Sequence, residues 1–118
     1  MNIDSRLAEL QQAVQQFCEA RDWDQFHGQK DLAIGLVTEA SELLEHFRFL
    51  SAEECDARLM DRRTDIEIEL ADIFFFLLRF AQLYEVDLGA ALARNLERND
   101  KRYPVEKARG SNKKHTDF

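Results

Sequence analysis

The sequence predicts an all-α fold, a helical bundle of four main helices and one short helix. Three observations lead to it: helix breakers are rare, helix-forming residues dominate, and apolar residues recur at helical spacing. The 118 residues include four glycines and a single proline, Pro104, so roughly the first hundred residues are almost uninterrupted. This length is expected to give one domain with a modest core, for which burial against another subunit is useful.

The first two helices are indicated by apolar stripes. Across about residues 5–20, leucine, valine and phenylalanine recur at steps of three and four, as on the buried face of an amphipathic helix. Residues 21–30 break this period and gather aromatic side chains, so we expect a loop or short turn there. A broader apolar face predicts the second helix over about residues 31–50.

The next two helices are indicated by a cap and by apolar content. Ser51 and Glu54 form a Ser-x-x-Glu capping box, which predicts a short helix to about residue 60. Residues 64–84 predict the third main helix, in which the apolar run at residues 73–78 covers nearly the whole circumference. In so small a protein, such a helix is expected to be buried on several sides, in part by a second subunit.

The last main helix is expected to begin after Asp87, a favourable N-cap residue. It should end before Pro104, because proline disfavours helix at the residue that precedes it. We therefore expect a helical domain over residues 1–104 and an irregular, basic tail over residues 105–118 that contributes to the substrate site.

Charge is distributed unevenly along the chain. The net charge is −7, yet residues 101–118 carry +4 and the first hundred residues −11. An acidic body argues against binding to the phosphate backbone of long nucleic acids. The longest strongly apolar run is far shorter than a membrane span, and the cysteines and the N-terminal sequence show no disulfide or signal pattern. We expect a cytoplasmic protein without a nucleic-acid or membrane partner.

Two pairs of acidic residues form the candidate site. Glu39 and Glu42 are three residues apart on the second helix, and Glu69 and Asp72 repeat this spacing on the third. Residues three apart share one helix face, and both pairs adjoin the apolar faces. Packing of the two helices should therefore gather four carboxylates into one partly buried cluster.

A divalent cation would relieve the repulsion within such a cluster. Carboxylate and water ligands suit Mg²⁺, with Mn²⁺ as a substitute, and Mg²⁺ commonly joins carboxylates to substrate phosphates. A di-iron bundle needs Glu-x-x-His motifs, whereas Glu42 is followed three residues later by Glu45, with His46 one position too late. Spacing alone leaves both a metal site and an ordinary solvated surface open, and it names no substrate.

Four short motifs accompany the acidic pairs. They are Trp23-Asp-Gln-Phe-His27, Asn99-Asp-Lys-Arg-Tyr-Pro104, Ala108-Arg-Gly-Ser111 and Lys114-His-Thr-Asp117. Together with the Glu-x-x-Glu and Glu-x-x-Asp pairs, they resemble the MazG-like superfamily, and within it the dCTP pyrophosphatase branch. The acidic pairs are typical of the whole superfamily, whereas the first motif and the C-terminal motifs are more specific to the branch. The resemblance extends from about residue 14 to the C-terminus.

The resemblance implies an all-α protein, assembled as a dimer of dimers, that hydrolyses nucleoside triphosphates to monophosphate and pyrophosphate. It implies that Glu39, Glu42, Glu69 and Asp72 bind Mg²⁺ or adjoin its ligands. The metal would neutralise phosphate oxygens, orient a water at the α-phosphorus and stabilise the departing pyrophosphate. A carboxylate that does not bind the metal would act as general base, and Glu42 and Glu69 are the two candidates.

The resemblance also implies which residues contact the base. Trp23 and Phe49 would stack on it, and Asn99 would hydrogen-bond to it. Core packing is the alternative for each aromatic. His27 and Lys30 belong to the same expected substrate-binding set, although His27, with no nucleophile paired to it, is more typical of a structural loop histidine.

Donors to the triphosphate are expected from the basic segment near the C-terminus. A solvated tail without a role in binding is the alternative. The residues concerned are Arg102, Tyr103, Arg109 and Lys113.

Three positions depart from the dCTP-preferring relatives. Val14, Phe49 and Phe76 stand where those relatives often carry histidine, tryptophan and tyrosine. We expect a homodimeric or homotetrameric (deoxy)nucleoside triphosphate diphosphatase that removes unwanted nucleotides and prefers dCTP-like pyrimidines. The alternatives are hydrolysis of dUTP or of a phosphoribosyl nucleotide, and a non-catalytic helical interaction module. Retention of all four acids counts against the last of these.

Overall fold

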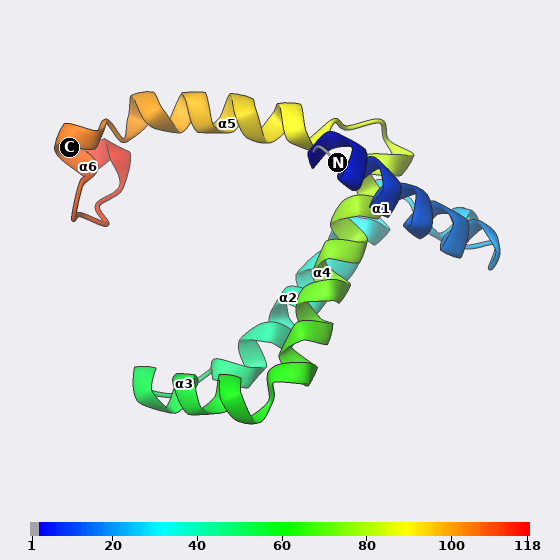
Figure 1. The fold of residues 1–118 in the computed structure, drawn as a ribbon, viewed down its shortest axis with the longest axis horizontal. Helices are drawn as coiled ribbons and strands as arrows, with labels where there is room; N and C mark the ends of the chain where they lie inside the picture. The colour runs from blue at the N-terminus through cyan, green and yellow to red at the C-terminus, as the bar shows by residue number, and fades with distance from the viewer. Residues whose placement is uncertain (1–2) are drawn as a thin grey trace. The chain divides into compact units, whose positions relative to one another are not determined.

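The computed structural model of the chain describes residues 3–118, and throughout that range it contains helices and turns but no strand (Figure 1). The chain divides into two compact units, residues 1–85 and residues 86–118. The first unit contains α1 (Ile3–Glu19), the short 3₁₀ helix η1 (Asp24–Phe26), α2 (Gln29–Phe47), α3 (Ala52–Asp61) and α4 (Arg63–Leu83). The second contains α5 (Leu88–Arg102), α6 (Val105–Ala108) and the 3₁₀ helix η2 (His115–Asp117). The all-α prediction is confirmed.

The two longest helices of the first unit, α2 and α4, pack side by side and run antiparallel (Figure 1). At one end, the hydroxyl of Tyr84 donates to the carbonyl oxygen of His27 over 2.8 Å. Towards the other end, Nε2 of His46 lies 3.9 Å from Oε1 of Glu69. Residue numbers therefore rise along α2 as they fall along α4, and α3 joins the two helices at the far end.

A glycine in the middle of α2 lets the two helices approach closely. A Cβ atom at Gly35 would lie 2.4 Å from the nearest ring carbon of Phe76 in α4, well inside van der Waals contact. The ring of Phe76 therefore occupies the space that a side chain at Gly35 would need. The core of the first unit lies between α1, α2 and α4, and its fully buried apolar residues are Cys18, Leu32, Ile66, Leu78 and Ala81.

The two predicted caps are present at the start of α3 and α5. Oγ of Ser51 accepts from the backbone N–H of Glu54 over 3.2 Å, and Oε1 of Glu54 accepts from the backbone N–H of Ser51 over 3.0 Å. At the start of α5, Oδ1 of Asp87 accepts from the backbone N–H of Ala90. Both predicted helix starts are confirmed.

The ends of α2 differ from the prediction. The helix begins two residues earlier, at Gln29, because the carboxylate of Asp31 accepts from the backbone N–H of Gly28 and so caps the helix from within its first turn. It ends three residues earlier, at Phe47, because Phe49 adopts the left-handed conformation with φ of 67°. Phe49 therefore projects from the connection that follows α2.

The expectation of an irregular tail holds only in part, because residues 105–118 contain the short helices α6 and η2. Pro104 adopts an extended conformation, and its carbonyl oxygen accepts from the backbone N–H of Ala108, so a new helical turn, α6, starts directly after it. Farther on, the edge of the Tyr103 ring packs against His115 at 5.7 Å and against Phe118 at 6.0 Å between ring centroids. The functional division into residues 1–104 and 105–118 stays a prediction.

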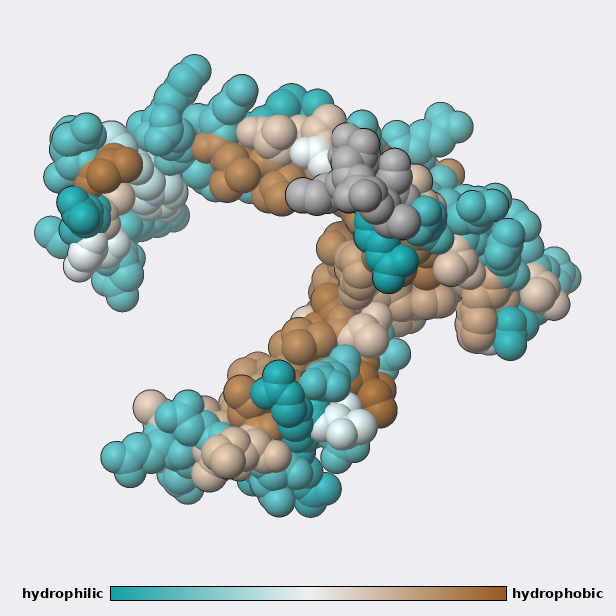
Figure 2. Space-filling model, viewed as in Figure 1, coloured by the Kyte–Doolittle hydropathy of each residue, from teal (hydrophilic) through white to brown (hydrophobic). Residues whose placement is uncertain are grey.

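Apolar side chains remain exposed along α2 and α4 (Figure 2). They include Ile34, Val37 and Leu44 of α2 and Ile68, Leu70, Phe74 and Leu77 of α4. Contiguous apolar surface of this kind is typical of a protein interface. Within residues 3–118, the structure shows no helix with the combined length and hydropathy that crossing a bilayer requires.

Candidate active site

Acidic side chains gather where α2 packs against α4. One carboxylate oxygen each of Glu39, Glu69 and Asp72 lies within 4.8 Å of the other two, and all three residues are half-buried. Glu42 is more exposed, and its carboxyl group lies within hydrogen-bonding reach of both Glu39 and Glu69. The structure therefore places three of the four predicted acids in a tight group and the fourth at its edge.

Proton affinity is raised inside this acidic group. Burial raises the pKa of Glu39 to about 7, and the hydrogen bond and charge of Glu42 and the charges of Asp72 and Glu69 act in the same direction. The pKa of Glu69 is raised as well, chiefly by burial and by Glu42, while the neighbouring His46 opposes the shift. Glu39 and Glu69 are thus shifted towards protonation, as expected for carboxylates that share one site.

Two oxygens of the acidic group have no partner. Oε2 of Glu39 and Oε2 of Glu69 are buried and accept no hydrogen bond, an arrangement that costs free energy in a finished core. A hard divalent cation would satisfy both oxygens and cancel the repulsion among the carboxylates. An all-oxygen donor set of this kind fits Mg²⁺ or Mn²⁺.

The aromatic segment before α2 is held in place by α4. The Trp23 side chain is about one-third exposed (36%), and its ring packs edge-on against Phe17 and His27, with centroids 5.5 Å and 6.1 Å away. Nε of Arg79 in α4 donates to Nδ1 of His27 over 2.9 Å. Sequence reasoning did not identify Arg79. The sequence feature that could have identified Arg79 is a single charged residue within an apolar segment, where a charged side chain needs a buried partner.

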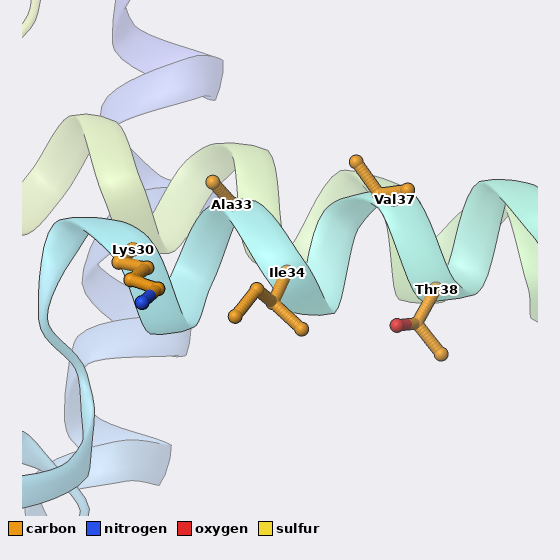
Figure 3. Close-up of a pocket in the computed structure, with 5 residues that line it drawn as sticks. All are labelled: Lys30, Ala33, Ile34, Val37 and Thr38. Carbon is orange, nitrogen blue, oxygen red and sulfur yellow. The ribbon is translucent and has the colours of Figure 1, made fainter.

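Lys30 lies in the first turn of α2 and is exposed. With Ala33, Ile34, Val37 and Thr38 it lines a shallow, largely apolar depression on the outer face of that helix (Figure 3). The residues that line the depression include none of the four acids. It is better described as uncovered helix surface than as a cleft for the reaction.

The two aromatics predicted to stack on the base lie at opposite ends of α2. Trp23 precedes the helix, whereas Phe49 follows it with a side chain that is 90% exposed and is covered only by the guanidinium of Arg48, 4.6 Å from the ring centroid. The 19 residues of α2 span roughly 28 Å at the usual rise per residue. Within one chain, the two rings do not face a common base.

The remaining predicted substrate-binding residues belong to the second unit. Asn99 and Arg102 lie in the last turns of α5, and Tyr103 follows that helix; all three are half-buried. Arg109 and Lys113 follow α6 and are exposed.

Known proteins resemble the chain in both sequence and structure. The model of the MazG nucleotide pyrophosphohydrolase domain family matches residues 27–106. The dCTP pyrophosphatase 1 of Bos taurus is 35% identical over 114 residues, which cover 95% of this chain and 68% of that protein. The protein of the same name from Homo sapiens is 32% identical over 114 residues, covering 95% and 67%. A crystal structure of a pyrophosphatase from Archaeoglobus fulgidus has a TM-score of 0.81 and 32% identity, covering 84% of this chain and 93% of that one.

The raised pKa of Glu39 predicts how the metal-free protein responds to pH. The unfolded chain ionises Glu39 near its ordinary pKa of 4.5, whereas the folded chain holds the proton up to about pH 7. The folded state thus binds more protons in this window, so Glu39 lowers stability progressively as pH rises through it. Glu39→Gln removes this loss. In thermal unfolding with EDTA, the Tm of the variant should exceed that of the wild type by a margin that widens from pH 5 to pH 8.

Glu45→Gln is the matched control, because Glu45 is an exposed acid on α2 that pairs with Arg48. Its Tm should follow that of the wild type at every pH. Addition of Mg²⁺ should raise the Tm of the wild type and of this control more than that of Glu39→Gln. A Tm margin that does not change with pH, or an equal Mg²⁺ effect in all three proteins, would contradict the assignment of Glu39.

Proposed function

The chain belongs to the MazG nucleotide pyrophosphohydrolase family, and on that premise we propose that it hydrolyses (deoxy)nucleoside triphosphates to monophosphate and pyrophosphate with Mg²⁺ held by Glu39, Glu69 and Asp72. The observation that carries the proposal is the group of three carboxylate oxygens within 4.8 Å, two of whose side chains also bear buried, unpaired oxygens. Such a site suits a cation far better than it suits three free carboxylates. Mn²⁺ would serve in place of Mg²⁺.

The general base in this proposal is Glu42. Its carboxylate adjoins the acidic group yet stays outside the three that lie closest together, and it is the most accessible of the four to water. Glu42 takes a proton from the water that attacks the α-phosphorus. The bond from that phosphorus to the bridging oxygen breaks, and pyrophosphate leaves with the bonding electrons. The bound cation supplies positive charge against the phosphate oxygens and the leaving group.

The nucleotide contacts expected from residues 99–113 stay part of this proposal. Residues 101–118 carry a net charge of +4, which complements a triphosphate that the acidic group alone would repel. The amide of Asn99 hydrogen-bonds to the base. The residues that donate to the phosphates are Arg102, Tyr103, Arg109 and Lys113.

Two copies of the chain complete the base site. Because the two stacking aromatics lie at opposite ends of α2, the base is placed between Trp23 of one protomer and Phe49 of its partner. The exposed apolar faces of α2 and α4 support a homodimer that buries them, and two such dimers give the tetramer. The half-exposed Trp23 and the fully projecting Phe49 then serve recognition rather than a core within one chain.

We propose dCTP-like pyrimidine nucleotides, including modified ones, as the preferred substrates in a cytoplasmic pool. The dCTP pyrophosphatases that resemble the chain support cytosine. Phe49 leaves more room and fewer hydrogen-bonding groups than the tryptophan common in that branch, which favours tolerance of base modifications. Hydrolysis of dUTP or of a phosphoribosyl nucleotide is the alternative.

Substitution of single acids should separate base catalysis from metal binding. With Mg²⁺ and a panel of canonical and modified nucleotides, the wild type should release monophosphate and pyrophosphate, fastest from dCTP-like substrates. Glu42→Gln should lower kcat by about a hundredfold or more and leave the affinity for Mn²⁺, measured by calorimetry, nearly unchanged. Asp72→Asn should lower both.

Glu45→Gln is again the matched control and should keep wild-type kinetics. Release of inorganic phosphate with diphosphate would contradict the proposed reaction. A fully active Glu42→Gln variant would remove Glu42 from the mechanism while leaving the reaction itself in place.

The shared base site predicts complementation between two variants that each bind dCTP weakly. Trp23→Ala and Phe49→Ala should each raise KM for dCTP sharply, because stacking on an aromatic ring is lost. After co-refolding, a mixed dimer holds one doubly altered site and one intact site. Up to half of the wild-type activity should return to such dimers at low dCTP concentration. Activity that stays at the level of the two separate variants would place both aromatics in one protomer's site or outside it.

A further inference from the structure

Arg79 is a charged side chain with no exposure to solvent. It lies in the last part of α4, between the buried residues Leu78 and Ala81. A guanidinium in such surroundings is costly unless its N–H groups are paired. The groups that pair with Arg79 show why α4 carries a charge at this buried position.

Three groups accept hydrogen bonds from the guanidinium. The carboxylate of Asp24 forms an ion pair with it, Nδ1 of His27 accepts from Nε over 2.9 Å, and Oε1 of Gln82 accepts from a terminal nitrogen over 2.6 Å. Asp24 and His27 lie more than fifty residues away in the sequence, in the segment before α2. Arg79 is therefore a clamp between α4 and residues 23–28, all inside the first unit.

The clamp decides the protonation of His27. Nδ1 accepts a hydrogen bond, so the ring is neutral and carries its proton on Nε2. Burial lowers the pKa of His27, and the charge of Arg79 lowers it further, against the opposing effects of Asp24 and Asp31. The hydroxyl of Tyr84, which donates to the carbonyl oxygen of His27, fixes the backbone of the same residue. His27 is thereby held as a hydrogen-bond donor at Nε2.

The clamp also supports Trp23. The indole packs edge-on against the imidazole of His27 and against the ring of Phe17. The Phe17 ring in turn packs against Phe75 of α4. Trp23 is thus held between the His27 ring, which Arg79 fixes, and the Phe17 ring, which packs against α4. The exposed part of the Trp23 side chain is therefore held in a single orientation.

We propose that Arg79 is a positioning residue, which fixes His27 as an Nε2–H donor and Trp23 as a stacking face for the base of the nucleotide. The inference rests on the proposed function of this segment in base recognition. A fixed donor suits the ring nitrogen N3 of cytosine, which accepts a hydrogen bond. It does not suit the N3–H of uracil, so the clamp contributes to discrimination between the two pyrimidines.

The test compares four variants with the wild type. Arg79→Lys keeps the charge but loses the planar fork that reaches two acceptors at once, and Arg79→Met removes the charge. Asp24→Asn weakens the clamp at a half-exposed position and tests it even if the buried substitutions prevent folding. Arg63→Met is the matched control, because Arg63 is an exposed arginine of α4 that pairs only with Glu67.

Two readouts need no nucleotide. Nitrogen-15 NMR of the wild type and of Arg63→Met should show His27 as the neutral Nε2–H tautomer, whereas Arg79→Met and Asp24→Asn should show a mixture or ordinary titration. The chain contains a single tryptophan, so acrylamide quenching of its fluorescence reports Trp23 directly. Quenching should increase in Arg79→Lys, Arg79→Met and Asp24→Asn and stay at the wild-type level in Arg63→Met.

Steady-state kinetics then connect the clamp to recognition. In the three clamp variants, KM for dCTP should rise about fivefold, the loss of roughly one hydrogen bond, with a much smaller change in kcat and a reduced preference for dCTP over dUTP. A wild-type His27 in the Nδ1–H tautomer, or clamp variants with wild-type quenching or wild-type KM values, would overturn the inference. If no variant and no wild-type protein hydrolyses any nucleotide, the proposed function fails, while the tautomer and quenching results still decide whether Arg79 positions the segment.

Discussion

The antiparallel packing of α2 on α4 is the contact on which the rest of the first unit depends. Its register is set where the ring of Phe76 fills the space left by Gly35. With this register, Glu39 faces Asp72 and Glu69, and His27 faces the end of α4. Successive residues of a helix lie about 100° apart around its axis. A shift of the helix register by one residue would therefore separate the acidic pairs.

The helix pair carries two polar centres of opposite character along its length. Towards the middle, carboxylates crowd together with two buried oxygens unpaired, so the metal-free protein is destabilised there at neutral pH. Towards the end of α4, each of the three nitrogens of the buried Arg79 guanidinium donates a hydrogen bond. The acidic group needs a bound cation to become favourable, whereas the Arg79 guanidinium already has its hydrogen-bond partners within the chain. This contrast agrees with a catalytic role for the acids and a supporting role for Arg79.

Much of the fold follows from local sequence. Ser51 and Asp87 marked helix starts because a capping side chain acts within three residues of itself, and the apolar stripes located the long helices. The ends of α2 were missed because Asp31 caps from inside the helix and Phe49 takes a left-handed conformation that no local pattern announces. The turn after Pro104 was also missed, because the polar composition of the tail hides a helix of four residues.

The acidic site was more predictable than its surroundings. Three-residue spacing placed each acidic pair on one helix face, and packing of the adjoining apolar faces joined the two pairs. The family resemblance, confirmed by the match over residues 27–106, added the reaction. Spacing along one helix carries no information about contacts across fifty residues. The clamp of Arg79 on Asp24 and His27 and the contact of His46 with Glu69 therefore needed the structure.

In the proposed reaction, the four acids direct water to the α-phosphorus of a nucleoside triphosphate. The most direct measurement is hydrolysis of dCTP with Mg²⁺ in water enriched in oxygen-18, followed by mass spectrometry of both products. Attack at the α-phosphorus places the heavy oxygen in the monophosphate and none in pyrophosphate, and this is the result we expect. Heavy oxygen in pyrophosphate would instead mean attack at the β-phosphorus and would contradict the account.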